Sequence, residues 1–95
     1  MTSKQRAYLK GLSQNIQPIF QIGKSGITPE MTAAIADALE KREIIKISVL
    51  KNCFEDPKIL AQTLAERTLS EVVMVIGKKI VLYKESKEHK KIVLP

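Results

Sequence analysis

The sequence predicts a small α/β domain in which the elements follow the order α-β-α-β-α-β-β and build a four-stranded mixed sheet. Two cap-and-proline pairs, Thr28-Pro29 and Asp56-Pro57, mark helix starts. A short run of β-forming residues precedes each of these starts, and two further runs flank Gly77-Lys78-Lys79 in a hairpin pattern. A chain of 95 residues suits one domain, here expected as helices packed on the sheet in two layers.

The first half of the chain is expected to form a helix, a strand and a second helix. Thr2 or Ser3 caps the opening helix, which should stop near Asn15. Residues 19–22, after a proline, are short and rich in β formers. The second helix should run from Pro29 to about residue 42, because apolar residues recur there at helical spacing: Met31, Ala34, Ile35, Ala38 and Leu39.

The second half should supply a strand, a helix and a hairpin. Residues 44–50 alternate between apolar and polar side chains, as a half-buried strand does. After Asp56-Pro57, apolar residues at 60, 61, 64 and 65 give the third helix a buried stripe. Residues 71–76 and 80–83 then form the hairpin. Strand–helix–strand passages favour parallel neighbours and a hairpin is antiparallel, so the sheet should be mixed.

The end of the chain is expected to lie outside this domain, which covers residues 1–85. Residues 86–95 are a charged stretch, expected to be solvated, that closes on the apolar Ile92-Val93-Leu94. Fraying of this end is the favoured expectation. Packing back onto the domain and pairing with another molecule are the alternatives.

Charge is the first indication of function. Sixteen Lys and Arg residues against ten Asp and Glu residues give a net charge of +6, and the isoelectric point is about 9.6. A value above about 9 is one footprint of a nucleic-acid partner. Up to Pro29 the chain has no acidic residue but four basic ones, Lys4, Arg6, Lys10 and Lys24. We therefore expect one basic end of the molecule.

The loop Gly23-Lys24-Ser25-Gly26 is the candidate binding element. Two glycines allow a close approach of backbone to ligand, and the loop leads into a helix N-terminus, where amides and the dipole favour phosphate oxygens. Lys24 adds a cation and Ser25 a hydroxyl donor. An ordinary strand-to-helix turn is the alternative reading of the same pattern. A nucleotide P-loop is not expected, because that motif needs a glycine where this chain has Pro18.

Other residues give little support for a reaction or a cofactor. Cys53 has no partner cysteine, and His89 has no neighbour at metal-ligand spacing, so neither a metal site nor a nucleophile is expected. Lys78 and Lys79 are either a second basic contact or ordinary turn lysines. No apolar run approaches the roughly 20 residues of a membrane span. We expect a cytoplasmic protein that is not an enzyme and has no cofactor or small-molecule substrate.

An ordered set of sequence stretches resembles the CRM domain (chloroplast RNA splicing and ribosome maturation) in its free-standing bacterial YhbY form. The resemblance covers roughly residues 2–85. It rests on six stretches in order: Lys4 to Leu9, Pro18 to Thr28, Ala38 to Glu40, Ile44 to Ile47, Val75 to Lys78, and Val81 to Tyr83.

This resemblance implies a fold similar to the C-terminal domain of bacterial translation initiation factor three. It implies RNA as the partner, since bacterial members are associated with precursors of the large ribosomal subunit. The family's glycine loop maps onto Gly23, Lys24, Ser25 and Gly26, and its basic helix surface onto Lys4, Arg6 and Lys10. The hypothesis is a backbone-directed binder of structured RNA. The alternative is a protein-interaction module that docks through its sheet edge or its C-terminal tail, and the oligomeric state stays open.

Overall fold

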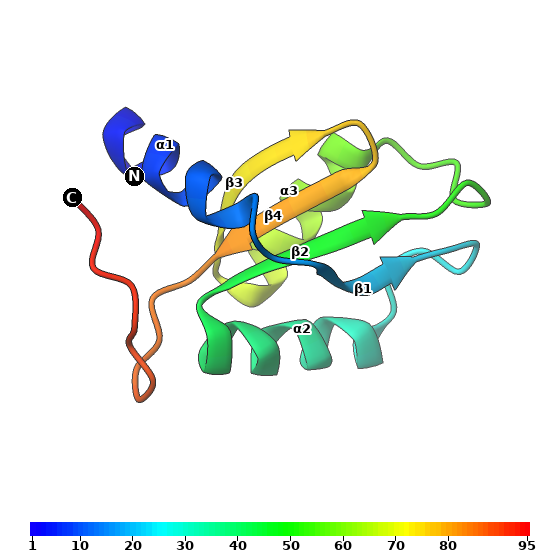
Figure 1. The fold of residues 1–95 in the computed structure, drawn as a ribbon. Coiled ribbons are helices and arrows are strands. Elements are labelled where there is room, and N and C mark those ends of the chain that lie inside the picture. Colours follow the sequence, from blue (N-terminus) through cyan, green and yellow to red (C-terminus); the bar gives the residue numbers. More distant parts are fainter.

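The computed structural model describes all residues, 1–95, and contains three helices and four strands in the predicted order (Figure 1). The sequence prediction placed every element, with bounds that differ by one or two residues. No helix combines the length and apolar character that a membrane crossing requires. The elements are α1 (Ser3–Ser13), β1 (Pro18–Ile22), α2 (Pro29–Arg42), β2 (Ile44–Val49), α3 (Pro57–Thr68), β3 (Glu71–Ile76) and β4 (Lys79–Tyr83).

The strands form one mixed sheet in the spatial order β1-β2-β4-β3. β1 and β2 are parallel neighbours, as a strand–helix–strand passage predicts. β3 is not a neighbour of β2, because β4 lies between them and pairs antiparallel with both. The β2–α3–β3 connection therefore gives two parallel strands, as expected, but these strands are not neighbours in the sheet. The α/β class and the mixed sheet are confirmed.

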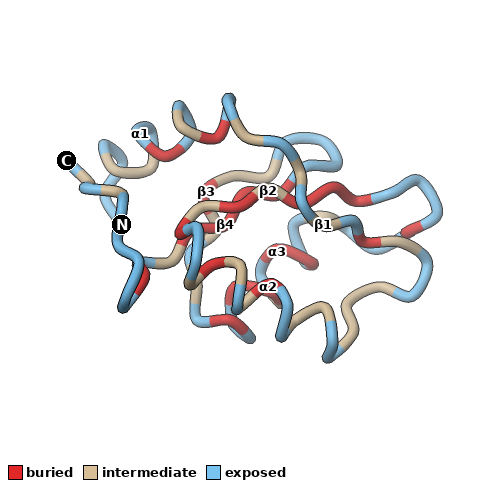
Figure 2. Tube along the Cα trace, turned by 60° about the horizontal axis from the view of Figure 1, so that its bottom comes forward, coloured by how far each residue is buried: buried red, intermediate tan, exposed pale blue.

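Both faces of the sheet are covered, one fully and one in part (Figures 1 and 2). α2 and α3 lie on one face over the main core, which takes Ile80 and Leu82 from β4. α1 lies on the other face, where Leu9 packs with Val81 and Tyr83 of the same strand. The two-layer arrangement thus describes the sheet with α2 and α3, and α1 adds a partial third layer.

Each helix begins at the cap that the sequence indicates. Thr2 forms a complete capping box with Gln5. The Thr28 hydroxyl accepts from the N–H of Met31 at 3.1 Å, and the Asp56 carboxylate accepts from the N–H of Lys58 at 2.9 Å. Such caps contribute about 1 kcal/mol each. The caps of α2 and α3 set the last residue of the loop that precedes each of these helices.

The C-terminal segment folds back onto the domain, so the expectation that it frays is wrong. The buried Glu43 side chain accepts hydrogen bonds from three backbone N–H groups: Ser86 at 2.8 Å, Lys91 at 2.6 Å and Ile92 at 2.8 Å. Beyond these bonds, Ile92 and Leu94 pack against the smaller core under α1. The tail folds back because the buried Glu43 carboxylate needs hydrogen-bond donors, and the tail supplies them. No local sequence pattern indicates this packing.

Glu40, one turn before Glu43, holds the same segment from the solvent side. Its carboxylate accepts from the Ser86 hydroxyl at 2.6 Å and from the N–H groups of Lys87 at 3.0 Å and Glu88 at 3.1 Å. The Ser86 hydroxyl bond, followed by these two backbone donors, lowers the pKa of Glu40 from 4.5 to about 2. The carboxylate is therefore charged in the folded protein throughout the neutral range.

Candidate nucleic-acid interface

The glycine loop forms a tight turn at the carboxyl end of β1. The N–H of Gly26 donates to the carbonyl of Gly23 at 3.0 Å, and Gly26 has a φ of 66°, a conformation that L side chains rarely adopt. Lys24 and Ser25 occupy the tip and are exposed. Their backbone N–H groups donate no hydrogen bond within the protein. The tip therefore offers two amides, a hydroxyl and an ammonium group to an anion.

The N-terminus of α2 supplies fewer donors than the sequence suggested. The N–H groups of Met31 and Thr32 bond to Thr28, and Pro29 has no N–H. Glu30 also places a carboxylate in the first turn. The helix end is thus largely satisfied by its own cap, and the anion-binding donors of this region are those of the glycine loop.

A second loop, residues 50–55 between β2 and α3, lies against the glycine loop. The N–H of Leu50 donates to the carbonyl of Ile22 at 2.8 Å. A Cβ placed on Gly23 would stand 3.4 Å from Oδ1 of Asn52, and one placed on Gly26 would stand 3.1 Å from Oε2 of Glu55. Each glycine of the motif therefore faces a polar side chain of the 50–55 loop.

The two loops enclose a shallow hollow of about 270 Å³. Lys24, Ser25 and Gly26 line one side, and residues 52–55 line the other. The glycine loop is therefore one wall of a two-walled site and not an isolated turn.

The β3–β4 hairpin brings further lysines to this end of the sheet. The N–H of Val49, where β2 ends, donates to the carbonyl of Lys78 at 2.7 Å. Lys78 is exposed, and the ammonium group of Lys79 donates to the Ser48 hydroxyl at 2.9 Å. We call the glycine loop, the 50–55 loop and the hairpin turn at 77–79 the glycine-loop end of the molecule.

The cations of α1 lie at the other end, so the expectation of one basic end is wrong (Figure 1). The Arg6 guanidinium donates to the carbonyls of Val72 and Val73, near the start of β3 and away from the hairpin turn. Lys4 and Lys10 are exposed on the same helix. The physical reason is the topology. The chain runs along β1 from the end of the sheet near α1 to the opposite end, and the glycine loop forms there.

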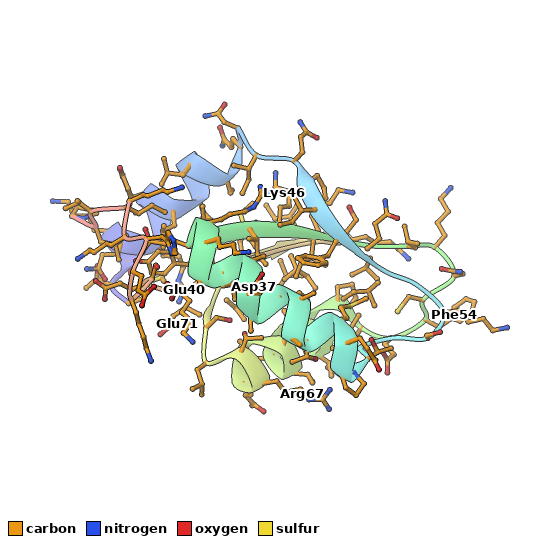
Figure 3. All side chains as sticks on the ribbon, turned by 90° about the horizontal axis from the view of Figure 1, so that it is seen from below. Asp37, Glu40, Lys46, Phe54, Arg67 and Glu71 are labelled. Carbon is orange, nitrogen blue, oxygen red and sulfur yellow. The ribbon has the colours of Figure 1, made fainter.

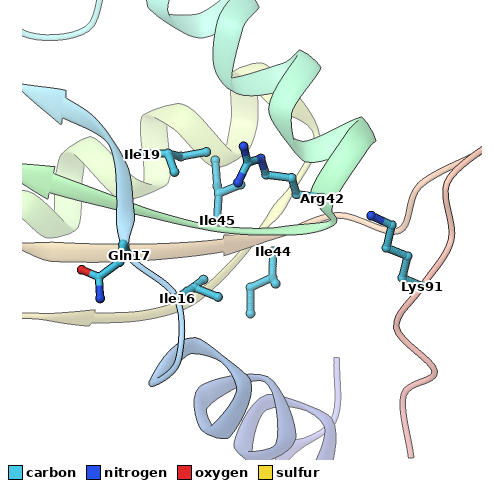
Figure 4. Close-up of a pocket in the computed structure, with 7 residues that line it drawn as sticks. All are labelled: Ile16, Gln17, Ile19, Arg42, Ile44, Ile45 and Lys91. Atoms are coloured by element: carbon cyan, nitrogen blue, oxygen red, sulfur yellow. The ribbon is translucent and has the colours of Figure 1, made fainter.

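Another hollow, of about 370 Å³, lies where β1 begins (Figure 4). Its apolar floor comes from four isoleucines of the α1–β1 connection, β1 and β2. Arg42 at the end of α2 and Lys91 of the folded tail supply two cations, and neither forms an ion pair within the chain. The hollow is separate from the glycine-loop end and depends on the tail being folded.

The remaining titratable and nucleophilic residues lie in different parts of the domain. Cys53 is a free, buried thiol, and His89 lies in the tail with its Nδ1 at 3.4 Å from the Glu40 carboxylate. No three His, Cys, Asp or Glu side chains come together as a metal-ligand group. Tyr83 is buried, and burial raises the pKa of its phenol above the ordinary value. Tyr8 is partly exposed on α1, away from the glycine loop.

The family model of the CRS1/YhbY (CRM) domain matches residues 1–84 of the chain. The chain belongs to the CRS1/YhbY family. The resemblance inferred from six short stretches is therefore confirmed.

Relatives of this CRM domain cover nearly all or all of it. It is 50% identical to the Probable RNA-binding protein YqeI of Bacillus subtilis over 95 residues, which are 100% of this chain and 99% of the relative. It is 34% identical to the RNA-binding protein of Haemophilus influenzae over 95% of this chain and 91% of that one. The solution structure of the hypothetical protein SAV1595 from Staphylococcus aureus superposes with a TM-score of 0.84 at 58% identity, over 100% and 99% of the two chains.

Sequence reasoning missed the contribution of the 50–55 loop of this CRM domain. Phe54 is 94% exposed in that loop, beside Asn52 and Glu55. Figure 3 shows it at the end of the molecule opposite Glu40 and the tail. One signal was available, since a large aromatic residue stands alone in a polar loop just before the Asp56 cap.

Proposed function

We propose that this CRM domain binds structured RNA by its sugar–phosphate backbone, with the glycine-loop end as the contact surface. The observation that carries the proposal is the exposed tip of the glycine loop, where Lys24 and Ser25 present a cation, a hydroxyl and two free amides. Such groups bind phosphate oxygens, and a Gly-x-x-Gly loop clamps backbone nucleotides in KH domains. The relatives named as RNA-binding proteins add independent support.

The RNA that we propose is ribosomal, within a precursor of the large subunit, and the proposed place of action is the cytoplasm. The family resemblance supports the first part, since bacterial members are associated with such precursors. The proposed role is binding without catalysis. Phosphate contacts give affinity through charge, and the glycine loop itself distinguishes little between bases.

Two groups of cations extend this contact. Lys78 lies at the same end as the glycine loop and would reach phosphates of the same RNA segment. Lys4 and Lys10 lie on α1 and would meet a second segment of a folded RNA. If about four to six phosphates are neutralised, log affinity falls with log salt at a slope of roughly −3 to −5.

The proposal is tested by RNA-binding salt titrations on the Lys24→Ala variant. Removing one phosphate-contacting lysine should weaken binding at every salt concentration and flatten the slope by about one unit. Lys41→Ala is the matched control, because Lys41 is exposed but pairs with Asp37 at 3.1 Å near the far end of α2. Circular dichroism should show the same fold in both variants.

An unchanged slope in Lys24→Ala, with the fold intact, contradicts the proposal. An equal loss in Lys24→Ala and Lys41→Ala does so too, because it would show that only the overall charge matters.

A further inference from the structure

Phe54 is the most exposed of the large apolar side chains, at 94%. The chain on both sides of it is held in place. The N–H of Cys53 donates to the carbonyl of Leu50 at 3.1 Å, and the Cys53 side chain is buried in the main core. On the other side, Asp56 caps α3. The ring is therefore presented to solvent by an anchored loop.

The groups around Phe54 are those that recognise an unpaired nucleobase. The hollow between the two loops is lined by Asn52, Phe54 and Glu55 on one side and by Lys24 and Ser25 on the other, and the Phe54 ring is open to solvent. Glu55 takes part in none of the ion pairs of the protein. In RNA, the deep and narrow major groove keeps side chains from the base edges of a helix, so aromatic stacking and base-edge hydrogen bonds are made chiefly with bases splayed out of it.

We infer that this hollow takes one unpaired nucleotide of the bound RNA, with its base stacked on Phe54 and its phosphate on the glycine loop. The inference rests on the proposed function and adds the kind of RNA to it. Glu55 is negatively charged and belongs to the wall formed by residues 52–55, so it repels a phosphate on that wall. The phosphate therefore takes the Lys24 wall, and the base takes the other.

The charge of Glu55 also determines which base edges the hollow favours. A carboxylate only accepts hydrogen bonds, so Glu55 favours bases that carry an exocyclic amino group. It disfavours uracil, whose one donor on this edge, N3–H, lies between two carbonyl oxygens that repel the carboxylate. Asn52 both donates and accepts, and it adjusts to each of the three amino-bearing bases. The site therefore separates paired from unpaired RNA strongly and separates bases from one another weakly.

The test uses two RNAs with the same stem, one with a single bulged nucleotide and one fully paired. Fluorescence anisotropy would compare the wild type with Phe54→Ala, Phe54→Leu and Phe54→Trp. Loss of a base–aromatic stack should weaken binding of the bulged RNA by roughly 5- to 150-fold in Phe54→Ala. Phe54→Leu should lose most of the same affinity and Phe54→Trp should keep it. Binding of the paired RNA should be the same in all four proteins.

Leu69→Ala is the matched control, since Leu69 is 80% exposed and follows α3 at its far end. It should bind both RNAs as the wild type does. Replacing the bulged nucleotide by uracil should weaken wild-type binding, and Glu55→Gln should reduce that difference.

The outcomes separate the inference from the proposed function. If Lys24→Ala weakens both RNAs while Phe54→Ala weakens neither, or weakens both equally, the nucleotide site is overturned and backbone binding stands. If Phe54→Leu binds the bulged RNA like the wild type, stacking is overturned, and position 54 makes only a non-stacking apolar contact with the RNA. If Lys24→Ala weakens neither RNA, the proposed function itself fails.

Discussion

The Glu55 carboxylate lies against Gly26, so that a Cβ at position 26 would stand 3.1 Å from Oε2. This contact joins the loop that follows β1 to the loop that follows β2. A side chain at position 26 would therefore meet two difficulties, a left-handed backbone conformation and the end of the Glu55 side chain.

Gly26→Ala should therefore destabilise the protein. Gly77→Ala is a suitable comparison, because Gly77 has a φ of 56° but nothing within 4 Å of an added Cβ. Each variant incurs about 1 kcal/mol for the left-handed residue. Gly26→Ala must also move the end of the Glu55 side chain by a few tenths of an ångström, but this side chain is exposed and flexible. We therefore expect a loss of unfolding free energy equal to that of Gly77→Ala or slightly larger, measured by urea denaturation. A smaller loss than in Gly77→Ala would contradict the described contact.

Arg6 should stabilise the fold more than its neighbours on α1 do. Its guanidinium donates to two carbonyls of the edge strand β3, at the irregularity between Val72 and Met74. Arg6→Ala leaves these acceptors without their partner, and we expect a loss of about 1–3 kcal/mol in unfolding free energy. Lys4→Ala, at an exposed site, should change it by less than about 0.5 kcal/mol. Equal effects would show that Arg6 does not fasten α1.

The folded tail should loosen in acid. Burial alone would raise the pKa of Glu43, but the N–H groups of Ser86, Lys91 and Ile92 outweigh it, and the pKa is lowered. The pKa of Glu40 is lowered from 4.5 to about 2. A lowered folded pKa means that the stabilisation is complete above the unfolded value and is lost as pH falls through the folded one. Tail order should therefore decline between about pH 5 and pH 2.

Hydrogen exchange of the Lys87 and Lys91 amides measures this decline. Glu43→Gln and Glu40→Gln should show weakened protection already at neutral pH, because an amide is a weaker acceptor than a carboxylate. Protection that is independent of pH in the wild type would contradict the role of the two carboxylates.

The two basic regions should differ in their share of RNA binding. Lys78 lies at the glycine-loop end, whereas Lys4 lies on α1 at the other end. On a short RNA that spans one contact surface, Lys78→Ala should flatten the salt slope by about one unit and Lys4→Ala should leave it unchanged. The reverse result would move the main contact to α1.

The elements were predictable because their signals are local. Thr28-Pro29 and Asp56-Pro57 mark helix starts by cap chemistry alone, and the hairpin follows from a glycine between two β-rich runs. The face of the sheet that α1 covers was not predictable, because helical spacing shows which side of a helix is buried but not what buries it. The position of β4 between β2 and β3 was not predictable either, because it depends on how all four strands pair.

The candidate site was predictable only in part. Gly23 to Gly26 stand together in the sequence, and their turn forms as expected. The opposite wall, with Asn52, Phe54 and Glu55, lies about 30 residues away, and only the parallel pairing of β1 with β2 brings it there. Arg6 is separated from the loop because β1 carries the chain from the end of the sheet near α1 to the opposite end. The bonds that hold the tail to Glu40 and Glu43 span more than 40 residues and leave no periodic pattern.

The most direct test of RNA binding at the glycine-loop end is an amide-resolved NMR titration of the protein with a bulged RNA hairpin. We expect the largest chemical-shift changes at Lys24, Ser25, Asn52 and Phe54, with smaller ones at the hairpin turn. Shifts confined to α1 and the tail, with the amides of Lys24 and Ser25 unmoved, would contradict RNA binding at the glycine-loop end.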